Sequence, residues 1–375
     1  MKEVDDMGKG KSNIGTIITV AGTYMAFAIG SGFASGQEIL QYFAAYGVMG
    51  FAALVLFFIV GSAMDTEFIT VGQREQFDNK GGVYEYYAGR IFGKFFDFFA
   101  NLFSYLCYVV MCAGAGATLN QYYGLPVWAG VVIMAAVSGL TVIMGLNRIT
   151  DIISKIGPAL IIIIIIVAVP NIFTGDYSVS DGIALTADLD ILKAADTWYM
   201  SVLNYAGFGI MYVVVFLPFY GKTLPSVKVA ASGQILGVAL FCITVLFVML
   251  AMFANIETMS EVQVPILALA TNLSPIFGAV FAIIIMFGIY SSAVPLLYGP
   301  AIRFVDEKKV SGKAVMLVMA MIGAFIPLFL PYNKLMNIIY TANGYIGVIF
   351  IILVAVKVAM RFAGKRKKQE RREAE

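Results

Sequence analysis

An apolar run near the N-terminus is longer than a lipid bilayer is thick. Residues 12–45 contain no Lys, Arg or Asp, and Glu38 is their only charged residue. One straight helix of roughly 33 residues would measure about 50 Å at 1.5 Å per residue, whereas the hydrocarbon core of a bilayer is about 30 Å thick. Gly30, Gly32 and Gly36 lie near the middle of the run, and glycine permits a helix to unwind. Because exposed backbone in a membrane lines a cavity or binds something, the run predicts a broken helix with a binding site.

The composition is that of an integral membrane protein. Of the 375 residues, 60% are hydrophobic and 13% are charged, and the mean hydropathy is +0.87; soluble domains carry about twice that share of charge. Histidine, the side chain most often used as a general base or metal ligand, is absent. The spans contain no nucleophile–base pair and no P-loop. We therefore expect neither an enzyme nor an ATP-driven protein, and no nucleic-acid partner.

Apolar length and polar punctuation predict an all-α protein with ten membrane-spanning helices. The predicted spans are roughly residues 13–44, 48–69, 92–122, 126–145, 149–172, 195–220, 226–255, 274–301, 312–330 and 333–361. With this alternation, all of the 25 Lys and Arg residues except Lys193 and Lys334 fall on the side of the two termini. The positive-inside rule then predicts a multi-pass plasma-membrane protein with both termini cytoplasmic.

The chain divides into tails and two halves. Residues 1–12 are expected to form a cytoplasmic tail rather than a signal peptide, and residues 362–375 form a polybasic tail expected to contact anionic lipids. Between them, an external acidic loop at 173–194 separates residues 13–172 from residues 195–361. Each half has five spans, so the second half enters the membrane in the opposite sense. The halves are therefore predicted to be inverted repeats.

The first span of each half carries a Gly-x-Gly sequence, GSG at 30–32 and GFG at 207–209. A single Gly-x-Gly in a membrane helix commonly serves close helix packing. Two of them in corresponding helices of an inverted repeat favour a pair of broken helices around a midplane site, as in transporters. Helices 1 and 6 are therefore both predicted to be broken.

Both stretches resemble a known family. YMAFAIGSGFASG resembles the unwound first helix of the amino acid–polyamine–organocation (APC) superfamily, whose members share the LeuT fold. NYAGFGIMY resembles the broken sixth helix of the neurotransmitter–sodium symporters. The resemblance extends over residues 13–361, and the short length and GSGFASGQE are most similar to the YkvI-type membrane proteins. It implies an ion-coupled secondary transporter of an amino acid or a related carboxylate- or amine-bearing compound.

The substrate is expected between helices 1 and 6. Free N–H groups and the positive end of a half-helix attract anions, and the resemblance assigns a substrate carboxylate to Gly30, Ser31 and Gly32. Further candidates contribute carbonyls, polar side chains or an aromatic lid: Tyr105, Tyr108, Asn204, Tyr205, Ala206, Gly207 and Phe208. The alternatives are that Phe208 faces lipid or the core, and that the tyrosines bond neighbouring carbonyls.

The resemblance also implies a sodium site between helices 1 and 8. Its ligands would be the carbonyls of Ala26, Ile29 and Gly288 and the hydroxyls of Ser291 and Ser292. Oxygen ligands of this kind suit a hard cation. The alternative is that the two serines bond back to their own helix.

Proton coupling stays open as the rival mechanism. Some sodium-independent relatives place a lysine of span 5 where sodium would lie, which here is Lys155, although a lysine near a helix end commonly snorkels. Glu38 is the one acid of the first span and so a functional candidate. It could bind a cationic substrate end, carry a proton or pair with Lys334. A ligand sensor on the same fold is a further alternative, and no cofactor beyond the coupling ion, Na⁺ or H⁺, is expected.

Overall fold

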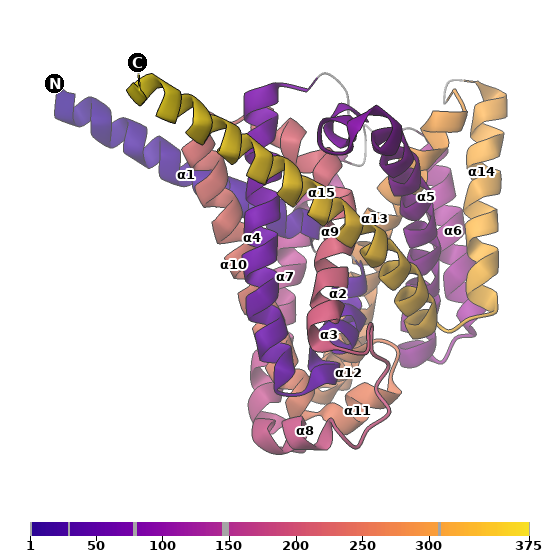
Figure 1. Ribbon diagram of the computed structural model, residues 1–375. Coiled ribbons are helices and arrows are strands. Elements are labelled where there is room, and N and C mark those ends of the chain that lie inside the picture. The colour runs from indigo at the N-terminus through magenta and orange to yellow at the C-terminus, as the bar shows by residue number, and fades with distance from the viewer. Residues whose placement is uncertain (1, 29–30, 78–80, 145–149, 307–308, 375) are drawn as a thin grey trace.

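The computed structural model describes residues 2–28, 31–77, 81–144, 150–306 and 309–374, and side chains at 13–28, 32–77, 81–144, 160–306 and 309–364. This part of the chain is helical and contains no strand (Figure 1). The helices are α1 (Lys2–Ala28), α2 (Ser31–Ser35), α3 (Gln37–Tyr42), η1 (Ala44–Tyr46), α4 (Met49–Glu75), α5 (Gly81–Tyr123), α6 (Val127–Met144), α7 (Thr150–Thr174), α8 (Val179–Leu185), α9 (Trp198–Lys222), α10 (Val227–Ala254), α11 (Ile256–Glu261), α12 (Pro265–Leu273), α13 (Pro275–Phe304), α14 (Val310–Phe325), η3 (Ile326–Leu328) and α15 (Tyr332–Ala374).

The membrane-spanning character predicted from the sequence is confirmed. Within the described residues, eight helices are long and apolar enough to cross a membrane, and a bent pair formed by α7 and α8 makes a ninth if it counts as one span. The described apolar part of α1, Asn13–Ala28, is shorter. The count of ten spans and the division into two inverted halves stay predictions.

The helices begin where local chemistry satisfies their first N–H groups. The Ser226 hydroxyl accepts the N–H of Val229 at the start of α10, and the Ser274 hydroxyl accepts that of Phe277 at the start of α13. Such N-caps replace hydrogen bonds that the first turn cannot make within the helix. In lipid this matters more than in water, because no solvent is present to satisfy the backbone.

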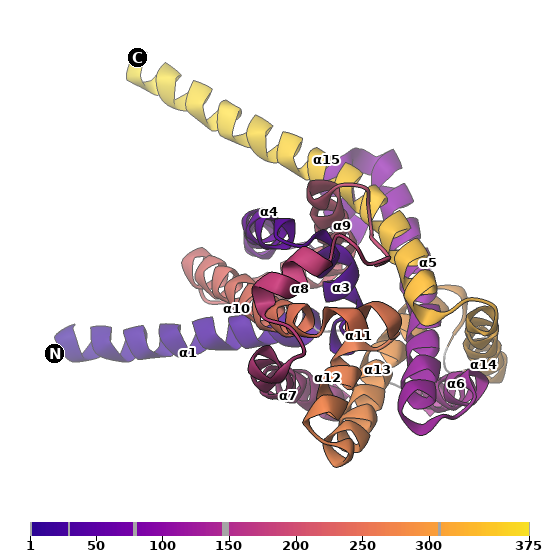
Figure 2. The ribbon, with the colours of Figure 1, turned by 90° about the horizontal axis from the view of Figure 1, so that it is seen from below.

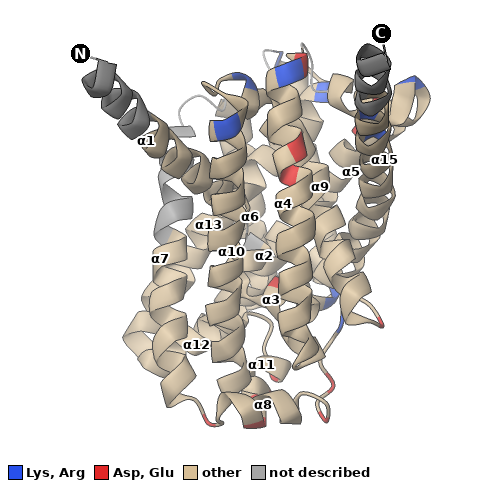
Figure 3. Cartoon of the chain, turned by 60° about the vertical axis from the view of Figure 1, so that its left-hand side comes forward, with Lys and Arg blue, Asp and Glu red and all other residues tan. Residues whose placement is uncertain are grey.

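Both ends of the chain lie on one face of the bundle, which we call the terminal face (Figure 1). The opposite end, the far face, is covered by α8, α11 and α12 (Figure 2). Figure 3 shows that Lys and Arg gather mainly toward the terminal face, whereas the loops of the far face carry mainly Asp and Glu. This distribution matches the charge alternation of the sequence, and the cytoplasmic assignment of the terminal face stays a prediction.

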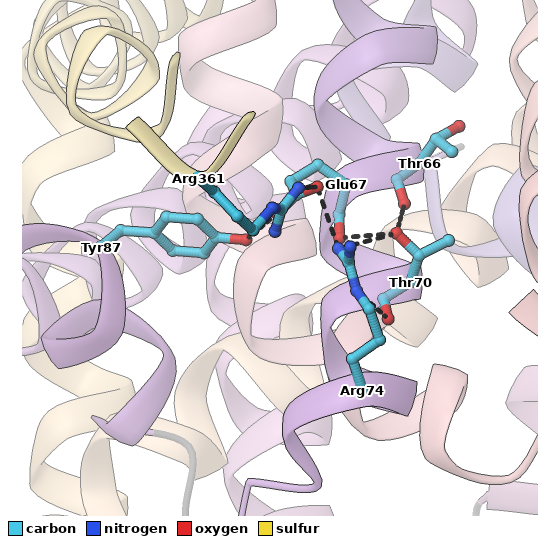
Figure 4. Close-up of polar contacts among 6 residues, drawn as sticks. All are labelled: Thr66, Glu67, Thr70, Arg74, Tyr87 and Arg361. Carbon is cyan, nitrogen blue, oxygen red and sulfur yellow. Dashed lines mark hydrogen bonds and ion pairs between the residues drawn. The ribbon is translucent and has the colours of Figure 1, made fainter. Parts of the chain in front are cut away.

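A charged cluster ties three helices together near the terminal face (Figure 4). Arg361 of α15 binds the Glu67 carboxylate of α4 through two parallel hydrogen bonds of 2.7 Å. The Tyr87 hydroxyl of α5 donates to the same carboxylate at 3.0 Å, and Arg74 lies 3.1 Å from it. Bidentate arginine–carboxylate pairs are strong and geometrically specific. The cluster therefore fixes α15 against α4 and α5.

Candidate functional site

The first predicted span is described as several helical pieces. α1 ends at Ala28, residues 29 and 30 lie outside the described part of the chain, and α2 begins at Ser31. Within the described residues the helix is interrupted at Gly36, which separates α2 from α3 with a φ of +87°. A side chain is strained at this φ, so glycine suits the position. The chain thus crosses this region as three helical pieces.

A cavity of about 720 Å³ lies beside these pieces. Its lining comes from α1, α4, α5, α9, α10, α13 and α15, with Glu38 contributed by α3. Most of the lining side chains are aliphatic or aromatic, and among the described lining residues Glu38 and Asp65 are the only charged ones. A largely apolar cavity with a few placed polar groups is the usual form of a small-molecule site.

Glu38 lies at the inner end of the cavity. Its side chain is only 5% exposed, and one carboxylate oxygen accepts a hydrogen bond of 2.9 Å from the Tyr205 hydroxyl. The other oxygen lies against Gly32, in the space that a side chain at that position would need. Gly32 therefore leaves room for the protein's own carboxylate at the start of the outer helical pieces.

Asp65 is a second buried acid on the same cavity. It belongs to α4, is 4% exposed and lies near the hydroxyl of Tyr24. The structure therefore presents two buried carboxylates, each with a tyrosine beside it and each facing the same space. No described lysine or arginine forms an ion pair with either, since the described ion pairs involve Glu67 and Asp97.

The cavity extends toward the terminal face. Along α9 its lining runs from Tyr205 to Tyr220, which lies two residues before the end of that helix at Lys222. Lys222 in turn donates to the carbonyl of Phe77, in the segment that follows α4 at the terminal face. Phe27 of α1, another lining residue, is 39% exposed.

Toward the far face the pieces of the interrupted helix are sealed by hydrogen bonds. The hydroxyls of Ser35 and Tyr332 lie 2.8 Å apart, which joins α2 to the start of α15. The Gln37 side chain donates to the carbonyl of Val262 at 3.0 Å, which joins α3 to the segment before α12. The arrangement is that of a site reached from the terminal face and closed on the other side.

Several predicted substrate residues lie on this cavity. Tyr205, Ala206 and Phe208 line it, and the Phe208 ring stacks on that of Tyr340 with 4.1 Å between ring centroids. Gly30 lies outside the described residues, as does the side chain of Ser31.

Tyr105 and Tyr108 do not line this cavity, and both bond to neighbouring carbonyls instead. The Tyr105 hydroxyl donates to the carbonyl of Met319 at 2.7 Å, and the Tyr108 hydroxyl donates to that of Ala320 at 3.2 Å. Both partners belong to α14. The face of α5 that lines the cavity carries Ser104, Cys107 and Met111, which is not the face that carries Tyr105 and Tyr108.

The predicted break in the sixth span is also wrong, because α9 is one helix from Trp198 to Lys222. A side chain at Gly207 would meet the backbone of Gly344, Gly347 and Val348 on α15. Gly207 therefore serves close packing, the alternative use of such a motif. Asn204, a predicted substrate residue of the same helix, is fully buried and does not line the cavity, and its amide has no partner among the described residues.

The predicted sodium ligands are only partly assembled. Ala26, Ser291 and Ser292 all line the cavity, whereas Ile29 lies outside the described residues. Both serine hydroxyls donate to the carbonyl of Gly288, at 2.8 and 3.4 Å. This is the back-bonded arrangement, and a bound ion would have to compete with it.

Lys155 and the Glu38–Lys334 pair are the remaining candidates for ion coupling. Lys155 belongs to α7, but its side chain lies outside the described residues. Lys334 is exposed near the start of α15, whereas the buried Glu38 carboxylate bonds to Tyr205. The suggested Glu38–Lys334 pair is therefore not formed in this structure.

Asp65 is the main site residue that the sequence interpretation missed. The signal was present, because Asp65 lies within the second predicted span, and an ionisable residue inside a membrane is a functional candidate by default. Tyr24 and Cys107 were also missed, whereas Gly209 was noted as part of the GFG stretch but not as a site residue. Tyr24 and Cys107 carry no comparable sequence signal, since uncharged tyrosines and cysteines are common in apolar helices.

Comparison with known proteins supports the fold. The chain matches no family model. The uncharacterized membrane protein YkvI of Bacillus subtilis (strain 168) is 22% identical over 351 residues, which cover 92% of this chain and 97% of that protein. The uncharacterized protein YyaD of the same organism is 26% identical over 280 residues, covering 73% and 77%. The chain is a sequence relative of YkvI.

Comparison with solved structures shows the architecture. A mutant of the Eremococcus coleocola manganese transporter superposes with a TM-score of 0.57 at 12% identity, covering 91% of this chain and 85% of that one. The inward-facing conformation of Mhp1 superposes with a TM-score of 0.51 at 14% identity, covering 90% and 75%. At these identities the likeness shows the fold alone. The chain has the LeuT fold, as the sequence resemblance implied.

Proposed function

We propose that this protein is a secondary active transporter that works by alternating access. The observation that carries the proposal is the cavity beside the interrupted first helix, which extends toward the terminal face and is sealed toward the far face. A transporter that alternates would pass through such a state. The likeness to a manganese transporter and to inward-facing Mhp1 favours transport over catalysis on this fold.

The proposed cargo is an amino acid or a related small compound that bears a carboxylate or an amine. The site comprises the region of Gly30, Ser31 and Gly32 and the cavity residues Tyr205 and Phe208. The cavity volume of about 720 Å³ is within the range of small-molecule sites.

Sodium is the proposed coupling ion, held by Ala26, Ile29, Gly288, Ser291 and Ser292. Support comes from the three of these residues that line the cavity together. Proton coupling is the second candidate, favoured by the buried carboxylate of Glu38; Lys155 is the other residue that could serve it.

Uptake into proteoliposomes tests the proposal. Purified protein is reconstituted, radiolabelled amino acids and amines are added outside, and an inward sodium gradient or a pH gradient is imposed. We expect at least one solute to accumulate above its equilibrium level and to leak out when the gradient is collapsed.

Two variants test whether sodium is the coupling ion. If sodium drives uptake, Ser292→Ala should reduce the response to sodium at least tenfold, whereas Ser180→Ala, at an exposed position of α8 on the far face, should not. Saturable binding without accumulation under either gradient would contradict transport and favour a sensor.

A further inference from the structure

We propose that the cavity binds an organic cation, such as a protonated amine, between Glu38 and Asp65. The inference deepens the proposed function, because it takes the same cavity as the solute site and narrows the class of solute. It does not depend on whether the solute is then transported.

The described lining of the cavity lacks a positive charge to match its two buried acids. Glu38 and Asp65 are each at least 95% buried, and no described lining residue is basic. A buried carboxylate is costly to ionise unless it is paired. A tyrosine hydroxyl supplies one hydrogen bond but no charge, so a cation in the cavity would provide the counter-charge that both carboxylates lack.

Glu38 occupies the place beside the first Gly-x-Gly stretch. Its carboxylate lies against Gly32, the position at which a substrate carboxylate would be expected from the unwound-helix resemblance. A second carboxylate brought there by a ligand would meet a like charge at short range in a medium of low dielectric constant, which is unfavourable. The protein's own acid thus favours a ligand that presents a positive group to this end of the cavity.

The lining of the cavity is rich in aromatic side chains. Eleven of the described lining residues are Phe or Tyr. Aromatic faces attract ammonium groups and also bury hydrocarbon. A strongly hydrated inorganic ion gains little from such walls, and the described residues contain no group of three or more acidic or cysteine side chains that could hold a metal. The lining therefore favours an organic cation with apolar substituents.

The two carboxylates lie at different depths. The Tyr205 ring, whose hydroxyl bonds Glu38, lies 5.3 Å from the Phe57 ring of α4. Asp65 follows Phe57 by eight residues on the same helix, a rise of about 12 Å at 1.5 Å per residue. Since the lining continues to Tyr220, Asp65 lies between the inner end and the terminal face. We infer that Asp65 is the first carboxylate that an entering cation meets and that Glu38 is the second.

A matched set of three probes tests the charge requirement. The probes are 2-phenylethylammonium, the neutral 2-phenylethanol and the anion 3-phenylpropanoate, which share a ring and a similar chain. Binding to the full chain in detergent is measured by isothermal titration calorimetry. We expect the cation to bind at least tenfold more tightly than the other two. Equal or tighter binding of the alcohol or the anion, or binding of none of the three, would overturn the proposal.

Variants then test whether the carboxylates of Asp65 and Glu38 bind the cation. Asp65→Asn and Glu38→Gln should each weaken binding of 2-phenylethylammonium at least tenfold, whereas Asp65→Glu should stay within about threefold. Asp188→Asn, which neutralises an exposed acid of the far-face loop, is the matched control and should bind like the wild type. Unchanged affinity in both neutralised variants would overturn the assignment. Should a variant fail to elute as a single folded species, the wild-type probe comparison still decides the charge class.

The outcome separates this inference from the proposed function. If the cation binds as expected but no solute accumulates in vesicles, transport fails and the ligand class stands. If an anion or a neutral solute accumulates and the cation does not bind, the ligand class fails and transport stands. A third result is possible, in which sodium stabilises the protein only when Asp65 is present and Asp65→Asn leaves the affinity for 2-phenylethylammonium unchanged. Asp65 would then be part of the sodium site and not of the solute site.

Discussion

The two Gly-x-Gly stretches look alike in sequence and serve different purposes in the structure. Near the first, the helix is interrupted at Gly36, and Gly32 leaves room for the carboxylate of Glu38. At the second, α9 continues without a break, and Gly207 lets α15 approach at backbone distance. The same residue pattern thus makes a polar site in one helix and a tight helix crossing in the other.

The difference comes from what each glycine meets. A side chain at Gly32 would meet the end of one flexible side chain, whereas a side chain at Gly207 would meet the backbone of another helix. Gly209, two residues later, meets nothing within 4 Å and lines the cavity instead. A motif in a membrane helix therefore has to be judged by the neighbour of each glycine, which the sequence does not give.

The largest effect is expected from Gly207→Ala. The added methyl group would overlap the backbone of α15, which cannot move away without separating two long helices, so we expect a loss of about 3 kcal/mol of unfolding free energy. Thermal or denaturant unfolding of the purified protein measures it. Gly209→Ala is the matched control and should be neutral or stabilising by up to about 1 kcal/mol, because alanine favours a helix and the site has room. Equal effects of the two substitutions would contradict the packing role of Gly207.

A smaller effect is expected from Gly32→Ala. The obstructing group is the Glu38 carboxylate, which can rotate away, so we expect a loss of about 1–2 kcal/mol of unfolding free energy. Combined with Glu38→Ala, the loss should largely disappear, because the space is then empty. A double-mutant cycle measured by unfolding checks this coupling. Strict additivity of the two substitutions would mean that Glu38 does not lie against Gly32.

The smallest effect is expected from Tyr205→Phe, which removes one hydroxyl and keeps the ring. We expect a loss of about 1 kcal/mol, because Glu38 loses a hydrogen bond but faces a cavity where water can replace it. In a Glu38→Gln background the same substitution should cost less, since a neutral acceptor forms the weaker bond. The unfolding free energies of the four proteins give the comparison, and an unchanged cost in that background would argue against a charged Glu38.

Much of the fold was predictable from the sequence, because the cost of placing charge and unpaired backbone in lipid limits a chain of this composition to apolar helices. An interruption of the first span was predictable from the excess length of its apolar run, and the structure describes one at Gly36; a break at Gly30 stays a prediction. The side of α5 that faces the cavity was not, because Tyr105 and Cys107 lie in equally apolar surroundings and only tertiary packing separates them. Asp65 could have been found by applying to the second span the rule that identified Glu38.

The central claim is that the cavity is a passage that opens on the terminal face and ends at Glu38. A cysteine at Gly209, where the structure leaves room for a side chain, tests it in a background with Cys107, Cys112 and Cys242 replaced by serine. Labelling with a membrane-impermeant maleimide is measured in sealed vesicles of both orientations. We expect labelling from the side of the termini, with slower labelling when 2-phenylethylammonium is present. Labelling from the far face alone, or none from the side of the termini, would contradict the account.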